Sequence, residues 1–273
     1  WILSRFSQVC LKVTSLIEEY DVGEAARALY EFLWGEFCDW YIEMTKERLY
    51  SEDKKKKDET LAVLLHVLEG TLKLLHPFMP FITEEIWKKL PGTKNDTIML
   101  SSWPKAEEKY ISKEVDGQVA ILMEIIKSIR NIKAELNVPH TKKPEAIFLT
   151  KDRSEHDLVR SCEKYIKELA RVESLEVKEK LDQKPEHSAT AVVSKIEIYI
   201  PLKGLIDFDQ EIDRLAKEIS KMEAELDKVN KKFDNEDFAK NAKPEVIEKE
   251  KKAKAQLEAK RRTLQERLAS LRS

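Results

Sequence analysis

Apolar residues recur every three or four positions along most of the first half of the chain, which is the period of an amphipathic α-helix. Asp21 is of a residue type that caps helices, and a helix should end before Pro77, because proline disfavours helical geometry in the preceding residue. We predict a charge-dense bend over residues 51–59 and a loop over residues 93–109. The predicted helices cover residues 1–20, 21–50, 61–75, a short segment around Glu84 that ends at Pro91, and residues 115–136. We therefore predict a helical bundle over residues 1–137.

The pattern changes after Asn137, where the helical period is lost. Between Glu145 and Leu205 the sequence indicates a strand, a helix and two further strands, and the alternation over residues 192–202 is typical of one half-buried strand. We predict a small α+β module over residues 138–205. Gly204 is its one glycine, so the module has no glycine-rich phosphate loop, and nucleotide binding of the Rossmann or Walker type is excluded.

Two heptad seams follow, separated by a turn that contains Asn235, Asn241 and Pro244. The first seam consists of Phe208, Ile212, Leu215, Ile219, Met222, Leu226, Val229 and Phe233, and the second of Ile247, Glu250, Lys254, Leu257, Arg261, Leu264, Leu268 and Leu271. When the two seams are paired antiparallel, Ile219 lies opposite Arg261. We predict an antiparallel coiled-coil hairpin over residues 206–273 and, for the whole chain, a mainly α fold.

The composition agrees with long solvated helices, because charged residues make up 37% of the 273 positions and only 6 glycines and 9 prolines are present. The net charge is only -2, so nucleic-acid binding has to rest on local basic patches rather than on the bulk charge. The first predicted helix begins at Trp1 without a capping residue before it. We therefore expect the chain to be part of a longer protein.

The three cysteines, Cys10, Cys38 and Cys162, are far apart and form no CxxC pair, so we expect buried, reduced thiols. The five histidines are equally scattered, and the sequence suggests neither a metal site nor a Cys-His nucleophile. The sequence shows no signal peptide and no apolar run of membrane-spanning length. We expect a cytoplasmic protein that has no membrane partner.

Several motifs resemble the class I aminoacyl-tRNA synthetases. The bundle contains ALYEFLWGEFCDWYIE at residues 28–43 and HPFMPFITEEIW at residues 76–87. The second motif is shared by isoleucyl, leucyl and valyl members, whereas the EFCDWYIE run resembles the valyl members. IPLKGLID at residues 200–207 and the tip sequence FDNEDFAKNAKPEVIEKEK at residues 233–251 are similar to the junction and coiled coil of valyl-tRNA synthetases.

The resemblance implies that the bundle binds the anticodon arm of a valine-specific tRNA and that the hairpin contacts the outer corner of the tRNA. The family activates its amino acid on a Rossmann domain with HIGH and KMSKS signatures, and neither signature occurs here. We therefore expect no catalytic residue and no cofactor in this chain, with ATP and magnesium bound by the catalytic part of the parent protein. We expect a monomer that does not bind DNA.

RNA binding requires cations for phosphates and planar groups on which unstacked bases can rest. Tyr30 and Trp34 fall away from the apolar stripe of their predicted helix, and Arg27 shares their face. Phe6 belongs to the apolar stripe of the first predicted helix, which favours a core position. Lys127, Arg130 and Lys133 are equally typical of a solvated helix face. The candidates in the bundle are Arg5, Phe6, Arg27, Tyr30, Trp34, Lys127, Arg130 and Lys133.

The second arm of the hairpin is strongly basic. Residues 249–262 hold seven cations and two acids, a net charge of 7 − 2 = +5. A solubilising coiled-coil flank normally interleaves both signs, so this excess favours phosphate contact. The candidates in the hairpin are Lys252, Lys254, Arg261 and Arg262.

Three other functions compete with this interpretation. The chain could be the equivalent region of an isoleucyl or leucyl synthetase, which shares the HPFMPFITEEIW pattern. It could be a structural coiled-coil module, although two seams that pair within one chain argue against dimerisation. A stand-alone enzyme is poorly supported, because the sequence shows no metal cluster, glycine loop or nucleophile constellation.

Overall fold

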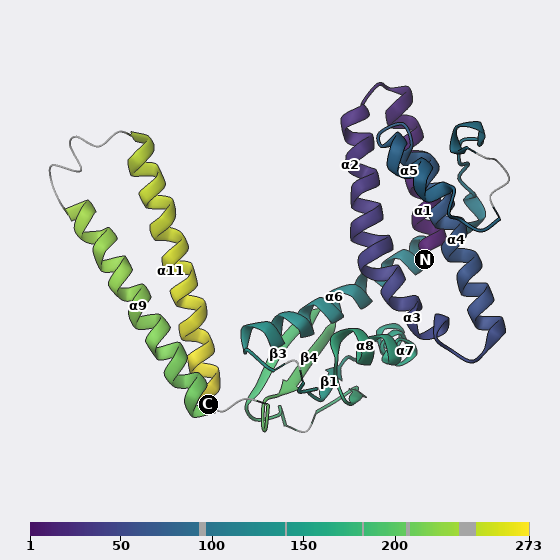
Figure 1. Ribbon diagram of the computed structural model, residues 1–273. Helices are drawn as coiled ribbons and strands as arrows, with labels where there is room; N and C mark the ends of the chain where they lie inside the picture. The colour runs from purple at the N-terminus through teal and green to yellow at the C-terminus, as the bar shows by residue number, and fades with distance from the viewer. Residues whose placement is uncertain (93–96, 140, 182, 206–207, 235–243, 273) are drawn as a thin grey trace. The chain divides into compact units, whose positions relative to one another are not determined.

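The computed structural model describes residues 1–92, 97–139, 141–181, 183–205, 208–234 and 244–272 (Figure 1). The chain divides into two compact units, Trp1–Glu124 and Ile125–Ser273. The described residues are mainly helical and include a small mixed sheet, which confirms the predicted fold class. The finer division into parts 1–137, 138–205 and 206–273 stays a prediction.

The helices of the first unit follow the predicted order. They are α1 (Ile2–Glu18), α2 (Val22–Phe32), the π-helix η1 (Leu33–Ile42), α3 (Glu43–Leu49), α4 (Lys54–Leu75), α5 (Pro80–Trp87), the 3-10 turns η2 (Ile98–Leu100) and η3 (Glu108–Tyr110), and the start of α6 (Lys113–Glu135). Asp21 caps α2 as expected, because its carboxylate accepts a hydrogen bond from the Glu24 amide at 3.2 Å. Helix α4 ends at Leu75, two residues before Pro77, as predicted.

The predicted charged bend over residues 51–59 is wrong for most of its length, because α4 already begins at Lys54. Asp53 caps this helix by accepting from the amides of Lys55 and Lys56 at 3.1 and 3.2 Å. The cap satisfies amides at the start of the helix, and Lys55 pairs with Glu59 one turn later at 4.0 Å. A run of charges is therefore compatible with helix here.

The helix predicted over residues 21–50 is continuous, but its centre is a π-helix of ten residues. A π-helix pairs residue i with residue i+5, and the buried side chains Phe32 and Phe37 are five positions apart. Tyr30 and Trp34 lie off this buried face and are 64% and 53% exposed. The predicted separation of the core stripe from this aromatic pair is confirmed.

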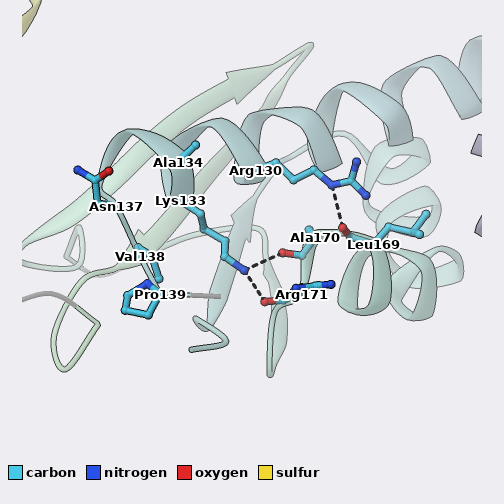
Figure 2. A pocket seen from close by; sticks show the side chains of 9 residues that line it. All are labelled: Arg130, Lys133, Ala134, Asn137, Val138, Pro139, Leu169, Ala170 and Arg171. Atoms are coloured by element: carbon cyan, nitrogen blue, oxygen red, sulfur yellow. Dashed lines mark hydrogen bonds between the residues drawn. The ribbon is translucent and has the colours of Figure 1, made fainter. Parts of the chain in front are cut away.

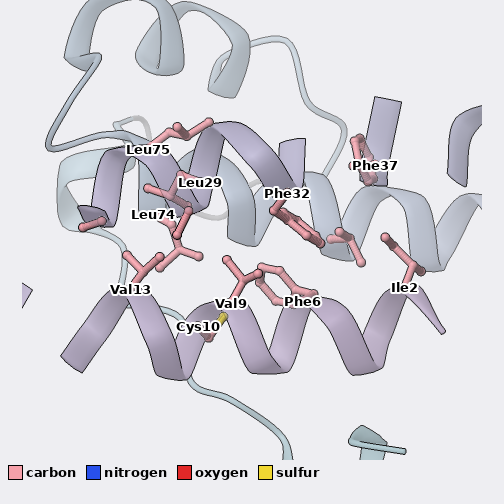
Figure 3. Packing of buried hydrophobic residues seen from close by; sticks show 13 residues of the cluster. Ile2, Phe6, Val9, Cys10, Val13, Leu29, Phe32, Phe37, Leu74 and Leu75 are labelled. Carbon is pink, nitrogen blue, oxygen red and sulfur yellow. The ribbon is translucent and has the colours of Figure 1, made fainter. Parts of the chain in front are cut away.

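The core of the bundle lies between α1, α2, η1 and α4, and Figure 3 shows its side chains pointing into the space between these helices. The Phe6 ring lies 6.2 Å from the Phe32 ring and 5.9 Å from the His66 ring, centroid to centroid. The same ring faces Gly70, where a β-carbon would meet it well inside van der Waals contact. A glycine at this point of α4 allows the close approach of α1.

The HPFMPFITEEIW motif builds the turn from α4 into α5. His76 Nδ1 lies 2.7 Å from the Thr83 hydroxyl, and Trp87 is buried with Leu72 and Ile98. α5 begins at Pro80, so Glu84 lies beyond the first turn of this helix. The Glu84 carboxylate accepts hydrogen bonds from the Thr97 hydroxyl at 2.9 Å and the Ile98 amide at 3.1 Å.

The second unit contains a four-stranded sheet in the order β2-β1-β4-β3. Its strands are β1 (Ala146–Leu149), β2 (Leu175–Lys178), β3 (Ser188–Val193) and β4 (Ile196–Pro201), and its helices are the end of α6, α7 (Arg153–Ser161) and α8 (Glu163–Ala170). β1 pairs with β2 in parallel and with β4 antiparallel. One helix was predicted between the first two strands, but it is divided at Cys162 into α7 and α8.

The single strand predicted over residues 192–202 is wrong, because it is a hairpin of β3 and β4. Val193 pairs with Ile196, so Ser194 and Lys195 form a two-residue turn, with a positive φ of 54° at Ser194. The turn shifts the alternation by one residue. Val193 is therefore buried with Ile196, and Val192 is 70% exposed.

The last two helices, α9 (Phe208–Asp234) and α11 (Pro244–Arg272), lie side by side and run in opposite directions (Figure 1). Glu218 on α9 pairs with Lys260 on α11 at 3.9 Å, one position before each member of the predicted pair Ile219 and Arg261. The buried seam residues are Leu215, Ile219, Met222, Leu226 and Leu264. The predicted turn with Asn235 and Asn241, and the side chains of the seam residues Phe233 and Ile247, lie outside what the structure describes.

Candidate nucleic-acid interface

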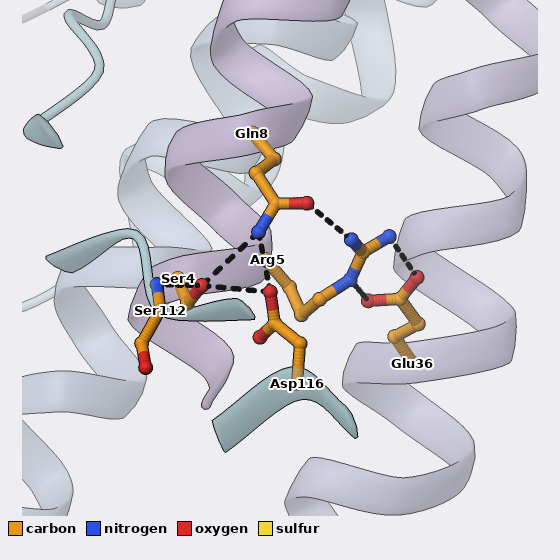
Figure 4. Close-up of polar contacts among 6 residues, drawn as sticks. All are labelled: Ser4, Arg5, Gln8, Glu36, Ser112 and Asp116. Carbon is orange, nitrogen blue, oxygen red and sulfur yellow. Dashed lines mark hydrogen bonds and ion pairs between the residues drawn. The ribbon is translucent and has the colours of Figure 1, made fainter. Parts of the chain in front are cut away.

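The first candidate cation, Arg5, is held by an intramolecular network (Figure 4). Its guanidinium donates from Nε and one terminal nitrogen to the two carboxylate oxygens of Glu36, both at 2.8 Å, and from the other terminal nitrogen to Gln8 at 2.6 Å. The hydrogen bonds to Glu36 raise the pKa of Arg5 above its ordinary value, and the side chain is only 30% exposed. This two-point contact fixes α1 to η1.

The network continues to the start of α6. Gln8 donates to Asp116 at 2.6 Å and to the Ser4 hydroxyl at 3.1 Å, and Ser4 donates to the same Asp116 oxygen at 3.0 Å. Ser4 also accepts from the Ser112 amide at 3.0 Å. Arg5 therefore belongs to a set of contacts that hold three helices together, and its charge is already compensated.

Phe6 is 4% exposed and packs in the core, which corrects its inclusion among residues presented to RNA. Its neighbours are Phe32, His66 and Gly70, as described above. The alternative interpretation of the sequence, in which Phe6 belongs to the apolar stripe of the first helix, is confirmed.

Arg27, Tyr30 and Trp34 lie on one face, and two of them form an exposed aromatic pair. The Tyr30 and Trp34 rings are 6.5 Å apart, centroid to centroid, at an angle of 50°. Arg27 pairs with Glu24 at 3.1 Å and with Glu31 at 3.5 Å. These acids compensate the guanidinium, so the two rings are the part of this face that is suited to stack on a base.

The three candidate cations of α6 have different environments, and Figure 2 shows two of them, Arg130 and Lys133. Lys127 is exposed. Arg130 Nε donates to the carbonyl of Leu169 at 2.9 Å, and the Lys133 ammonium donates to the carbonyls of Ala170 at 3.2 Å and Arg171 at 3.0 Å. Lys133 is only 9% exposed, which corrects the expectation of a solvent-facing cation. Both side chains satisfy carbonyls at the end of α8, where positive charge is also favoured by the helix dipole.

The four candidates of the hairpin lie along α11. Lys252 and Arg262 are exposed, and Lys254 lies 4.0 Å from Glu258 on the same helix. Arg261 is half-buried at the seam, and its Nε is buried without a hydrogen-bond partner. This position is consistent with a side chain whose stem packs in the seam and whose terminal nitrogens extend outward.

Sequence reasoning did not select Lys143 and Arg171, which the structure places beside the α6 cations. Burial, followed by the positive charges of Arg171, Arg130 and Lys143, lowers the pKa of Lys133. The other three cations therefore lie close enough to Lys133 to disfavour its charged form. Neither residue carries a sequence signal, because each lies in a loop with no periodicity.

Residues 1–149, more than half of the chain, match the family model of the anticodon-binding domain of tRNA ligase. The chain belongs to this family. A second family model, the valyl tRNA synthetase tRNA binding arm, matches residues 207–272, the part that contains α9 and α11. This tRNA-ligase chain is thus the anticodon-binding and tRNA-binding-arm region of a valyl-tRNA synthetase, as the sequence motifs predicted.

Its relatives include the valine--tRNA ligases of Carboxydothermus hydrogenoformans, with 43% identity over 99% of this chain, and Bacillus subtilis, with 39% identity over 100%. A third, from Listeria innocua, is 41% identical over 100% of this chain. The chain spans 30 to 31% of the length of these relatives.

Two further properties concern the described part of the tRNA-ligase chain. No helix there is long and apolar enough to cross a membrane. In the same residues, no group of three or more His, Cys, Asp or Glu side chains is arranged so that it could hold a metal ion.

Proposed function

We propose that this chain is the tRNA-binding part of a valine--tRNA ligase that supports the ATP-dependent attachment of valine to its tRNA. In this proposal the bundle of residues 1–137 receives the anticodon arm, and the arm of residues 206–273 contacts the outer corner of the tRNA. The chain binds no cofactor and carries out no chemistry itself, and ATP with magnesium acts in the catalytic part of the parent protein. The partner is a valine-specific tRNA, bound by a cytoplasmic monomer without DNA or membrane contact.

The observation that carries the proposal is the exposed pair of Tyr30 and Trp34. Two large rings, 64% and 53% exposed, lie together on a helical rod whose opposite face is core. Folding alone does not explain why these rings are exposed, because burial of either ring would stabilise the folded state. Stacking against unpaired bases of an anticodon loop would cover both rings, and such stacking is how proteins read single-stranded RNA.

The hairpin supports a second contact that uses different physics. Residues 249–262 carry a net charge of +5, and Lys252 and Arg262 of this stretch are exposed. Cations on a rigid arm neutralise phosphates without reading bases, so they add affinity that depends on salt. The bundle would therefore contribute selectivity, and the arm would contribute affinity for tRNAs in general.

The proposal is tested by measuring binding of the 273-residue chain to valine tRNA and to an unrelated tRNA over a range of salt concentrations. We expect preference for valine tRNA, and we expect Tyr30→Ala and Trp34→Ala to reduce this preference. Equal binding of both tRNAs, or variants with unchanged preference, would contradict the assignment of the anticodon face. A chain that dimerises and binds no tRNA would instead support the structural coiled-coil function.

A further inference from the structure

A hollow of about 660 Å³ lies between the last turns of α6 and the end of α8 (Figure 2). Arg130, Lys133 and Asn137 line it from the α6 side, and Arg171 lines it from the α8 side. A second hollow, of about 850 Å³, shares Arg171 and continues past Lys143 and Lys167. Both volumes fall within the range of about 300–1,000 Å³ that is usual for ligand pockets.

The first hollow is strongly positive. Three of its lining residues, Arg130, Lys133 and Arg171, are cations, and none of the described residues that line it is acidic. The second hollow adds two cations, Lys143 and Lys167, and two acids, Glu168 and Glu173. The combined lining therefore has a net charge of 5 − 2 = +3. Repulsion from Arg171, Arg130 and Lys143 lowers the pKa of Lys133 beyond the effect of burial, so an anion in this space would relieve an existing electrostatic cost.

Capping of α8 explains part of this cluster but not all of it. The amino and guanidinium groups of Lys133 and Arg130 satisfy carbonyls at the end of that helix. Arg171 and Lys143 have no such role, because in the described part of the chain their side chains make no hydrogen bond or ion pair. Arg171 and Lys143 are thus two exposed cations beside Arg130 and Lys133, whose nitrogens already donate to carbonyls.

The backbone at Arg171 makes its identity informative. The residue ends α8 in the left-handed conformation, with φ 53° and ψ 57°. Glycine or asparagine is the usual choice at this position, because a β-carbon is strained there. An arginine at this point disfavours the fold slightly and places a guanidinium at the junction of the two hollows.

We propose that these joined hollows bind a phosphodiester of the tRNA backbone, with Arg171 and Lys143 as the phosphate-contacting residues. The proposal rests on the proposed function and extends it, since it assigns an RNA contact to the small α+β module between the bundle and the arm. The contact reads charge and not sequence, because the site offers guanidinium and ammonium groups and no exposed aromatic ring.

The test compares the full chain with Arg171→Gly, Arg171→Asn and Lys143→Ala in binding to valine tRNA at several salt concentrations. Each variant should bind several-fold more weakly, and the slope of log K against log salt should fall by about one unit for each phosphate that the variant no longer neutralises. Both substitutions at Arg171 should leave the melting temperature equal or higher, because glycine and asparagine tolerate the left-handed backbone. Weaker binding by a more stable protein cannot be attributed to loss of fold.

Lys180→Ala is the matched control, because Lys180 is an exposed loop lysine of the same module that lines neither hollow. It should bind as the unchanged chain does. Equal losses for Lys143→Ala and Lys180→Ala would overturn the site in favour of a general effect of charge. Unchanged affinity and salt slope in the Arg171 variants would also overturn it while the proposed function stands. Absence of tRNA binding by the unchanged chain would overturn both.

Discussion

The Phe6 ring on α1 occupies the space that a side chain at position 70 of α4 would need. A β-carbon on Gly70 would lie 3.0 Å from Cε1 and Cε2 of Phe6, and closer still to Cζ. We predict that Gly70→Ala lowers the free energy of unfolding by about 1–3 kcal/mol, because the ring has to move within a packed core. Urea unfolding of the variant measures this loss.

Gly117→Ala is its control, because a β-carbon at position 117 of α6 meets no atom within 4 Å. This substitution should stabilise the protein by up to about 1 kcal/mol, since alanine favours helix over glycine. If Gly70→Ala were as stable as Gly117→Ala, the close approach of α1 to α4 would be wrong.

The Arg5–Glu36 contact gives the second prediction. Arg5→Lys keeps the positive charge but loses the planar two-point contact, so we expect the free energy of unfolding to fall by about 1–2 kcal/mol. Arg27→Lys, at an exposed arginine with two glutamate partners, should have little effect. Thermal unfolding of the two variants measures the difference. A loss at Arg27 equal to that at Arg5 would show that partial burial of Arg5 does not matter.

The pH dependence of stability should report Asp152. Its carboxylate accepts from Lys195 at 2.6 Å and from the Ser154 hydroxyl and amide, and the hydrogen bond from Lys195 is the largest cause that holds its pKa well below the ordinary range. The unfolded chain then binds a proton at a higher pH than the folded chain does. This contribution is present above the ordinary carboxyl pKa of about 4 and is lost as pH falls from there.

We therefore predict that Asp152→Asn flattens the acid side of the stability profile and changes the neutral side less, since asparagine also caps helices. Melting temperatures between about pH 2 and pH 7, the range over which carboxylates titrate, measure this effect. An acid limb with the same slope in the variant would mean that other carboxylates account for it.

We expect Arg261 to lower the stability of the hairpin and to strengthen its binding to tRNA. Its Nε is buried without a hydrogen-bond partner, so Arg261→Met should raise the stability of the hairpin by about 1 kcal/mol or more. The same change should weaken tRNA binding and lower its salt dependence. Arg262→Met, at an exposed neighbour, should weaken binding without the gain in stability. Thermal unfolding and tRNA titration of both variants test the pair, and a destabilised Arg261→Met would contradict the buried position of its Nε.

Trp34 and Phe37 separate binding from folding on the same helical segment. Trp34 is 53% exposed and Phe37 is 2% exposed. Phe37→Ala should lower the free energy of unfolding by about 3–5 kcal/mol. Trp34→Ala should change stability little and weaken binding of valine tRNA by about 1–3 kcal/mol, the range for one stacked base. A strongly destabilised Trp34→Ala variant with unaltered tRNA preference would show that Trp34 stabilises the fold and does not stack on a base.

The fold could be predicted where one physical signal dominated. The helical period placed the bundle helices, and off-stripe positions identified Tyr30 and Trp34 as exposed. The β3–β4 hairpin was missed because its turn, Ser194-Lys195, has none of the glycine or asparagine that usually marks such turns. The π-helix was missed because its apolar stripe resembles that of an α-helix over ten residues.

The environments of the candidate cations could not be predicted, because their partners are distant in sequence. Glu36 is 31 residues from Arg5, and the carbonyl of Ala170 is 37 residues from Lys133. Sequence shows that a cation is present, but only the fold shows whether a carboxylate or a carbonyl already holds it. For the same reason Lys143 and Arg171 became candidates only when the loops were placed beside α6.

The π-helix between α2 and α3 also affects where the bundle can tolerate the deletion of a residue. Each i→i+5 hydrogen bond encloses one residue more than an α-helical bond, so the segment Leu33–Ile42 holds surplus chain. Loss of one residue there would relax the backbone toward ordinary α-helical bonding. The same deletion inside α4 would turn every later side chain by about 100° and carry Leu74 and Leu75 away from the core. Single-residue deletions among relatives should therefore be tolerated in Leu33–Ile42 and excluded from α4.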